Sequence, residues 1–573
     1  MAGFALLIPV AMLPQTFDPF LLPKQLALLS LAALLLVQIT RTGFSLPHSR
    51  TATWALAAVE IAEVLAFAGA SDRLGAILGN FGYRLGITTH VALGVVFLFT
   101  MSNVRDERDV LWLLRFGLVS AGLVTAYGLL QFAGGDPFDW TAKSSAVFST
   151  IGNPNDLAGY AVLSVGSLGA LMTLPRRFRY ACLGIALTGL AATVVLSQSR
   201  SGVAGLVVAL IALPVLAAAN RWPTEQVRRL SITLGGVVAG AILVGLVSGE
   251  AGLLRDRFAR TFADSRTETS SVSTRVDIWR GSLAVFGEHP LFGVGQDGLL
   301  VNFNRERPPD LGPPFSQSSP TGYDPLVNSP HSFPIEVLVT LGVAGALSVL
   351  VLFAWLGRTF WCVLRARHSE TLPFLGAAGA GYLVVAGLNP LSLPSLAQAA
   401  VFSGIVAALA MTEPRTAALR AQRWRRVSFA GAASLFTAVC LFSVMHLWAD
   451  RQAFAAAEAA ANMDDASAVR HAGNAARLIP FESAYRRQKV QALANQGSSR
   501  GDPALVRKAL QEQTRFLREF PGLASDFIAL ARLQVALGEP GAVASLAAAR
   551  DASPYGINTA SDIANVTSML PPR

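Results

Sequence analysis

Long apolar stretches, separated by short polar loops, dominate the first 447 residues of the chain. A helix needs about 20 consecutive apolar residues to cross a bilayer, and runs of this kind recur from Phe4 to His446. We predict about thirteen spanning helices in an all-α membrane protein, although the first run is short for a span. They lie near residues 2–14, 25–40, 52–69, 87–102, 110–131, 155–174, 181–197, 203–219, 230–248, 333–356, 372–388, 397–412 and 428–447.

Basic residues alternate from one loop to the next along this region. The arginine-rich loops contain Arg41 and Arg50, Arg105 and Arg108, Arg176, Arg177 and Arg179, Arg221, Arg228 and Arg229, Arg358, Arg365 and Arg367, and Arg415, Arg420, Arg423, Arg425 and Arg426. The alternate short loops contain only Lys24, Arg73, Arg84, Lys143 and Arg200. The positive-inside rule places the arginine-rich loops in the cytoplasm. The N-terminus is then cytoplasmic, whereas the long segment 249–331 and the C-terminus lie outside.

Composition divides the chain into two parts. The whole chain is 52% hydrophobic and only 14% charged, against about 25% charged residues in soluble domains. After residue 447 Ala, Arg, Asp, Glu and Gln dominate, so we predict a membrane domain at 1–447 and a polar helical domain at 448–573. The net charge of +10 lies largely in membrane loops, so we expect no nucleic-acid partner.

The N-terminus and the cysteines add two exclusions. The first residues lack a basic segment and a clear cleavage site, so we expect a retained helix and no signal peptide. The three cysteines, Cys182, Cys362 and Cys440, offer neither a disulfide framework nor zinc-ligand spacing.

Prolines end several predicted helices in the C-terminal part of the chain. Helical stretches near 472–480, 517–521 and 547–554 each end at a proline, and Pro521 and Pro554 are 33 residues apart. This spacing is close to the period of about 34 residues of tetratricopeptide repeats, which stack into concave surfaces for peptides or proteins. A helical cap without a ligand is the alternative.

The long outer segment and its flanks carry the candidate chemistry. Arg200 stands between two apolar runs with Ser199 and Ser201, where a guanidinium can bind phosphate oxygens or simply reach the interface. Arg275 and Arg280 lie on a predicted helix of segment 249–331, either facing the same anion or solvated. Long ordered segments of this kind are often active-site lids.

His331 ends this segment directly before the next span. A lone histidine is usually structural, but a neutral imidazole beside the membrane can accept a proton from a sugar hydroxyl at neutral pH. Asn153 or Asn155 can cap the helix that starts near Leu157.

Two acids, Glu60 and Glu63, share a helix face within an apolar run. Such acids are functional candidates, or they pair with a buried arginine. The chain shows no phosphate-binding loop, no GxGxxG before a helix and no outer Asp-x-Asp or His cluster. ATP-driven and metal-assisted chemistry are therefore disfavoured, and no cofactor is expected.

An ordered series of short stretches resembles the O-antigen ligase and polymerase superfamily of bacterial envelope proteins. The matching residues, spread over about 1–447, are FDPF at 17–20, PK at 23–24, GYRLG at 82–86, QF at 131–132, FSTIGNPNDLA at 148–158, SQSRSG at 197–202, RVDIW at 275–279, HPLFGVG at 289–295 and NSPHSF at 328–333, followed by the Gly-containing helix 337–347. The family often has His-Asn where this chain has His331 and Ser332, so the local hydrogen bonding can differ.

The resemblance implies inverting, metal-independent glycan transfer at the outer face of the bacterial cytoplasmic membrane. The donor would be a glycan on a polyprenyl diphosphate. Arg200 and Arg275 match the arginines that hold the diphosphate, with Arg280 and Arg84 assigned to the same group, and His331 matches the general base. Asn153, Asn155, Ser199 and Ser201 would support them. Fixed guanidiniums would stabilise charge on the leaving diphosphate.

Several functions remain open at this stage. The acceptor can be a lipid-linked sugar, the growing glycan or a protein Ser/Thr, and the C-terminal domain slightly favours a protein partner. A transporter would suit the many spans, but the halves show no obvious repeat and a carrier has no clear need for the outer segment. A scaffold built on the C-terminal domain would leave Arg200 and His331 without a role.

Overall fold

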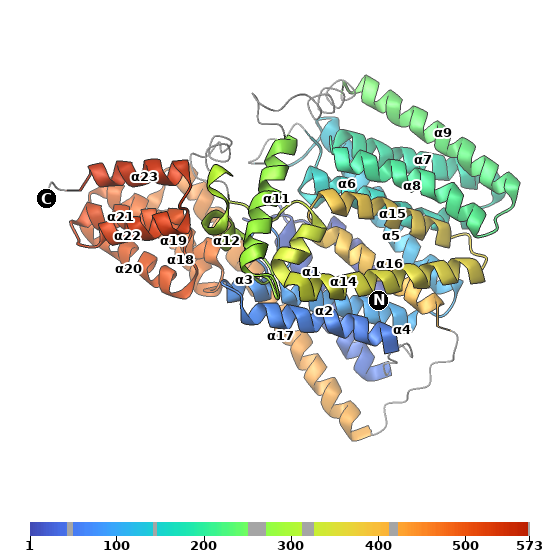
Figure 1. Cartoon of the computed structure of the whole chain (residues 1–573), viewed down its shortest axis with the longest axis horizontal. Coiled ribbons are helices and arrows are strands. Elements are labelled where there is room, and N and C mark those ends of the chain that lie inside the picture. The colour runs from blue at the N-terminus through green and yellow to red at the C-terminus, as the bar shows by residue number, and fades with distance from the viewer. Residues whose placement is uncertain (43–49, 141–145, 250–270, 312–325, 412–421, 571–573) are drawn as a thin grey trace.

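The computed structural model describes residues 1–42, 50–140, 146–249, 271–311, 326–411 and 422–570, which form helices and connecting turns (Figure 1). Eight helical segments in these ranges are long and apolar enough to cross a membrane. They are α1 (Leu21–Thr42), α5 (Glu107–Phe132), α6 (Pro154–Ser164) continued by η3 (Val165–Thr173), α7 (Arg176–Leu196), α8 (Arg200–Ala219), α9 (Thr224–Val247), α14 (Phe333–Ala366) and α17 (Gln422–Ala461).

The predicted count of about thirteen spans is not confirmed. Three further apolar helices, α4 (Ile87–Asn103), α15 (Leu372–Leu388) and α16 (Leu393–Leu409), are shorter. The first predicted span is a nine-residue 3-10 helix, η1 (Ala2–Val10). Helix α2 (Arg50–Ala68) carries both Glu60 and Glu63. The predicted basic residues Lys143, Arg415 and Arg420 lie outside the described residues.

The membrane helices pack closely where both partners have small residues. Helices α8 and α15 meet at Gly205 and Gly381. A Cβ atom added to Gly205 would lie 2.7 Å from the Gly381 carbonyl oxygen, and one added to Gly381 would lie 2.5 Å from the Gly205 carbonyl oxygen. Backbones can approach this closely only because neither position carries a side chain.

Four of the arginine-rich loops, all in the described part of the chain, meet at one end of the helix bundle. Arg179 forms an ion pair with Glu370 at 3.1 Å. Asn220 donates to the carbonyl oxygen of Arg367 at 2.7 Å, and Ser369 donates to Glu107 at 3.1 Å. Alternate loops therefore do meet at one end, as the positive-inside pattern requires. Which compartment this end faces remains a prediction.

Residues 290–295 of the long segment 249–331, which we predict to lie outside, insert into a break in α14. The described part of the segment contains α11 (Ser271–Glu288), α12 (Leu299–Glu306) and η4 (Pro309–Leu311). Between α11 and α12, residues 290–295 run beside Gly342, whose φ of 65° interrupts α14. The backbone hydrogen bonds across the break run from Val294 N to Val339 O (2.9 Å), from Gly295 N to Thr340 O (3.0 Å) and from Val343 N to Pro290 O (2.9 Å). They satisfy groups that the broken helix leaves unpaired.

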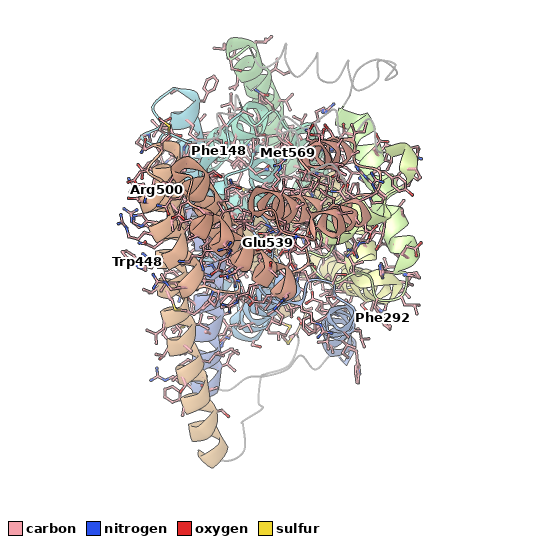
Figure 2. All side chains as sticks on the ribbon, turned by 90° about the vertical axis from the view of Figure 1, so that its left-hand side faces the viewer. Phe148, Phe292, Trp448, Arg500, Glu539 and Met569 are labelled. Atoms are coloured by element: carbon pink, nitrogen blue, oxygen red, sulfur yellow. The ribbon has the colours of Figure 1, made fainter. Side chains whose placement is uncertain are left out.

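Helix α17 continues beyond residue 447 without a break and leads into the C-terminal helices. These are α18 (Asp465–Leu478), α19 (Ser483–Arg500), α20 (Pro503–Glu519), α21 (Ala524–Leu537), α22 (Ala542–Ala552) and α23 (Ile557–Ser568). From α17 to α23, each helix packs against the next along the chain. Figure 2 looks onto this end of the molecule, with the C-terminal helices in front. Their identity as tetratricopeptide repeats stays a prediction.

Candidate functional site

The start of α8 presents the first candidate residue. Arg200 is the first residue of this helix, and the Ser199 hydroxyl caps it by accepting the N–H of Gly202 at 3.3 Å. The first turn of a helix exposes backbone N–H groups and the positive end of the helix dipole. This end of α8 therefore favours an anion even before the Arg200 guanidinium is counted.

A chain of polar side chains ties α8 to two neighbouring helices. Asn153 caps α6 by accepting the N–H of Asn155 at 2.8 Å. The Ser199 hydroxyl donates to the Asn155 side-chain oxygen at 2.9 Å and lies 3.1 Å from the Ser201 hydroxyl. Asn389, directly after α15, donates to the Ser201 hydroxyl at 2.5 Å. The starts of α6 and α8 and the end of α15 are therefore held together.

Arg275 joins this chain from α11 in the outer segment. Its guanidinium donates to the carbonyl oxygen of Leu388 at 2.9 Å and to the side-chain oxygen of Asn389 at 3.3 Å. Burial, and then the nearby Arg200 guanidinium, lower the pKa of Arg275. The Arg200 guanidinium therefore lies within electrostatic reach of Arg275.

Asn389 was missed at the sequence level. It lies 114 residues from Arg275 and 188 residues from Ser201 in the chain. Its only signal was a polar residue between an apolar run and Pro390. This position is typical of any helix end, so it did not indicate a site.

His331 sits in a tight turn before α14. Its φ of 53° is left-handed, and its N–H donates to the Ser329 hydroxyl at 3.2 Å. Ser329 in turn donates to Glu336 at 2.6 Å, and Trp279 donates to the Pro330 carbonyl oxygen at 2.9 Å. Burial, and then the Arg275 guanidinium, lower the pKa of His331 to about 4. The imidazole is therefore neutral at pH 7.

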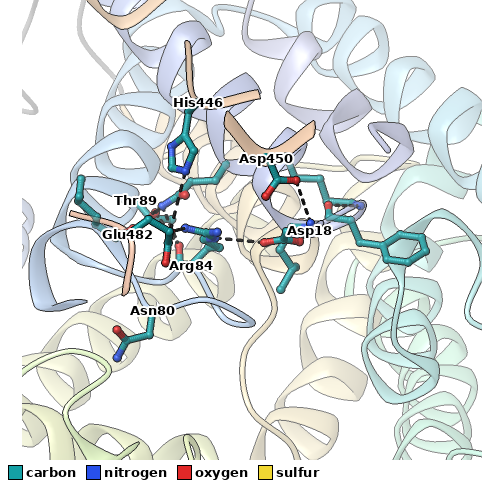
Figure 3. Close-up of polar contacts among 12 residues, drawn as sticks. Asp18, Asn80, Arg84, Thr89, His446, Asp450 and Glu482 are labelled. Carbon is teal, nitrogen blue, oxygen red and sulfur yellow. Dashed lines mark hydrogen bonds and ion pairs between the residues drawn. The ribbon is translucent and has the colours of Figure 1, made fainter. Parts of the chain in front are cut away.

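The other two arginines assigned to the diphosphate have carboxylate partners of their own. Arg280 is half exposed and pairs with Asp310 at 2.7 Å. Arg84 is 1% exposed and pairs with Asp18 at 3.1 Å and with Glu482 of the C-terminal domain (Figure 3). The structure therefore places Arg275 within electrostatic reach of Arg200 and of His331, but it engages Arg84 at the junction with the C-terminal domain.

Of the two acids on α2, Glu63 contacts a histidine and an amide. A Glu63 carboxylate oxygen lies 3.1 Å from a ring nitrogen of His90 on α4 and accepts from Gln296 at 3.2 Å. Glu60 of α2 lies beside Gly94 of α4. In the described part of the chain no three His, Cys, Asp or Glu side chains cluster as metal ligands do.

These features define a multi-pass membrane protein with a polar site at the end of its helix bundle. Residues 183–350 match the family model described as O-antigen ligase. The matched region runs from α7 into α14 and includes Arg200, Arg275, Arg280 and His331. It does not reach Arg84, Asn389 or the C-terminal domain. No curated protein matches the chain.

Proposed function

We propose that this protein is an O-antigen ligase-type glycosyltransferase, which transfers a glycan from a polyprenyl diphosphate to an acceptor hydroxyl. The reaction is inverting and metal-independent, and it occurs at the outer face of the bacterial cytoplasmic membrane. The observation that carries this proposal is the grouping of Arg200 and Arg275 beside the neutral imidazole of His331. The match of residues 183–350 to the O-antigen ligase model supports the same reaction.

The chemistry is a single displacement at the anomeric carbon. The acceptor oxygen forms the new glycosidic bond on one face while the bond to the diphosphate oxygen breaks on the other. His331 takes the proton of the acceptor hydroxyl as the bond forms. The electron pair of the broken bond stays on the diphosphate, where the guanidiniums of Arg200 and Arg275 and the first turn of α8 stabilise it.

Donor binding also changes the pKa of the base, His331. Before the donor binds, the Arg275 charge helps to hold the pKa of His331 near 4. An imidazole of such low proton affinity is a weak base. The diphosphate brings negative charge next to Arg275, which offsets the repulsion and raises the pKa of His331. The base becomes stronger when the donor is in place.

The remaining predicted residues act around this centre. Asn153, Asn155, Ser199 and Ser201 keep the starts of α6 and α8 in register. Arg280 adds positive charge from the same helix as Arg275. Arg84 contributes indirectly, by holding the loop between α3 and α4 in place.

The acceptor is a lipid-linked sugar, the growing glycan or a protein Ser/Thr, since all three fit the same chemistry. The C-terminal helices offer a surface for a protein partner on the outer side.

The test uses the full chain in lipid nanodiscs with a polyprenyl-diphosphate-linked oligosaccharide as donor. Release of polyprenyl diphosphate, coupled to formation of a glycosylated acceptor in the presence of chelator, is the expected result. Profiling the glycolipids, surface glycans and glycoproteins of a deletion strain then identifies the acceptor by the product that disappears. An unchanged profile in all three pools contradicts a transferase.

A further inference from the structure

The loop between α3 (Arg73–Leu78) and α4 is unusually constrained. Gly79, Gly82 and Arg84 have φ values of 84°, 95° and 60°. A Cβ added to Gly79 would lie 2.5 Å from the Arg84 carbonyl carbon, and one added to Gly86 would clash with the backbone of Gly79. The loop therefore folds back on itself and presents its side chains in fixed directions.

One side of this loop is held by the C-terminal domain. Arg84 pairs with Asp18 and with Glu482 (Figure 3). The Asp18 N–H donates to Asp450 of α17 at 2.9 Å, and the Tyr485 hydroxyl donates to the same carboxylate at 2.6 Å. All of these side chains are less than a tenth exposed. Burial makes each charge dependent on its partners, because water is not present to replace them.

The other side of the loop holds the outer segment. The Asn80 N–H donates to the Asp297 carboxylate at 2.6 Å, and the Asn80 side chain donates to the Asp297 carbonyl oxygen at 3.1 Å. Asp297 lies two residues after the stretch 290–295 that inserts into the break of α14. These two hydrogen bonds tie the loop to the outer segment.

The outer segment also contacts the turn of His331. The indole N–H of Trp279 on α11 donates to the Pro330 carbonyl oxygen at 2.9 Å. The Ser329 hydroxyl donates to Glu336 and accepts the N–H of His331, so the turn is also tied to α14. The loop therefore joins the C-terminal domain to the outer segment, and the outer segment joins it to the turn that carries His331.

We propose that Glu482 and Arg84 are positioning residues, through which the C-terminal domain sets the place of the His331 turn. The path runs from Glu482 to Arg84, along loop 79–86 to Asn80, and from Asn80 to Asp297 of the outer segment. From Trp279 of the same segment it reaches Pro330, beside His331. Loss of the Glu482 charge loosens loop 79–86 and lets the turn move. The catalytic consequence rests on the proposed transferase function, whereas the mechanical link does not.

The first test measures hydrogen–deuterium exchange of the full chain in nanodiscs. Glu482→Gln should speed exchange at 79–86 and at 328–332, and Glu482→Asp, which keeps the charge, should restore part of the protection. The matched control is Glu519→Gln, since Glu519 faces the buried Arg486 at 2.8 Å but inside the C-terminal domain. Unchanged exchange at 328–332 in Glu482→Gln, or an equal rise in Glu519→Gln, overturns the proposal.

The second test separates positioning from binding. In the nanodisc transfer assay, Glu482→Gln should lower kcat by about tenfold or more while the KM for the donor stays near its wild-type value, because a small displacement of a base is costly. A raised donor KM with unchanged kcat contradicts the positioning role. If wild-type protein transfers nothing, the proposed function fails, but the exchange experiment still decides the mechanical link.

Discussion

Arg275 lies within electrostatic reach of both Arg200 and His331. Arg200 lowers the pKa of Arg275, and Arg275 lowers that of His331, in each case after the effect of burial. The proposed diphosphate donor would bring negative charge to this region and offset that repulsion.

Replacing Arg275 or Arg200 by alanine should remove most of the transfer activity, because the developing charge on the diphosphate loses a donor; losses of about 10²–10³-fold are typical of such sites. Arg200→Lys should recover only part, since lysine keeps the charge but loses the planar pair of donors. The measurement is kcat/KM for the donor. Normal turnover by both alanine variants means that these arginines only reach the membrane surface.

His331→Ala should transfer at least about a hundredfold more slowly and still bind the polyprenyl diphosphate donor. Donor binding, measured separately, is the control. A variant with near-normal transfer removes the assignment of the base, and so does one that fails only because the donor no longer binds.

The pH dependence should reveal the coupling between donor and base. The base must be neutral, so the rate falls as the pH drops through the pKa of His331. The profile of kcat/KM reports the free enzyme and should bend near the low value of about 4. The profile of kcat reports the donor complex and should bend at a higher pH, because the bound diphosphate offsets Arg275. Identical profiles, or a bend of kcat/KM near 6.5, contradict this coupling.

At the scale of elements, the break in α14 joins the outer segment to the membrane helices. Backbone hydrogen bonds from 290–295 replace those that the helix loses at Gly342. A polar backbone group left unpaired in a membrane environment is costly, so the inserted stretch and the broken helix depend on each other. This dependence gives the HPLFGVG stretch at 289–295 a structural role.

Gly342→Ala should therefore weaken the attachment of the outer segment. The new Cβ would meet the backbone of Leu291 and Phe292 at a positive φ, and we expect the protein to be less stable by about 1–3 kcal/mol. Gly357→Ala on the same helix is the matched control, since no atom lies within 4 Å of an added Cβ there. Thermal unfolding in detergent compares the two, and an equal effect of both substitutions contradicts the role of the break.

At the scale of the whole molecule, the helix bundle has two chemically different ends. One gathers the arginine-rich loops, whereas the other carries the site and the C-terminal helices (Figure 1). We predict that the first end is cytoplasmic, so that the N-terminus lies inside and the C-terminus outside. A phosphatase fused after residue 573 should be active, and a fluorescent protein fused there should be dark. The opposite result would place the site on the wrong side for a lipid-linked glycan donor.

The helical, multi-pass character of the protein followed from the sequence alone. Apolar run length and loop charge act locally, so they can be assessed without knowing any tertiary contact. The same local reasoning predicted helix ends at Pro480, Pro521 and Pro554. Helices α18, α20 and α22 each end two residues before one of these prolines. The number of spanning helices did not follow from the sequence. Whether a short helix such as η1 or an acid-bearing helix such as α2 crosses the membrane depends on the helices that pack around it.

The candidate site, too, could be predicted only in part from the sequence. Arg200, Arg275 and His331 were found because each is a charged or titratable residue beside an apolar run. The role of Asn389, the partners of Arg84 and the break at Gly342 were decided only by the tertiary structure. The contacts of Arg84 join residues 66 and 398 positions apart, and the contact of Asn389 with Arg275 joins residues 114 positions apart. A local pattern cannot predict which distant groups will meet, because burial forces each polar group to find a partner wherever the folded chain supplies one.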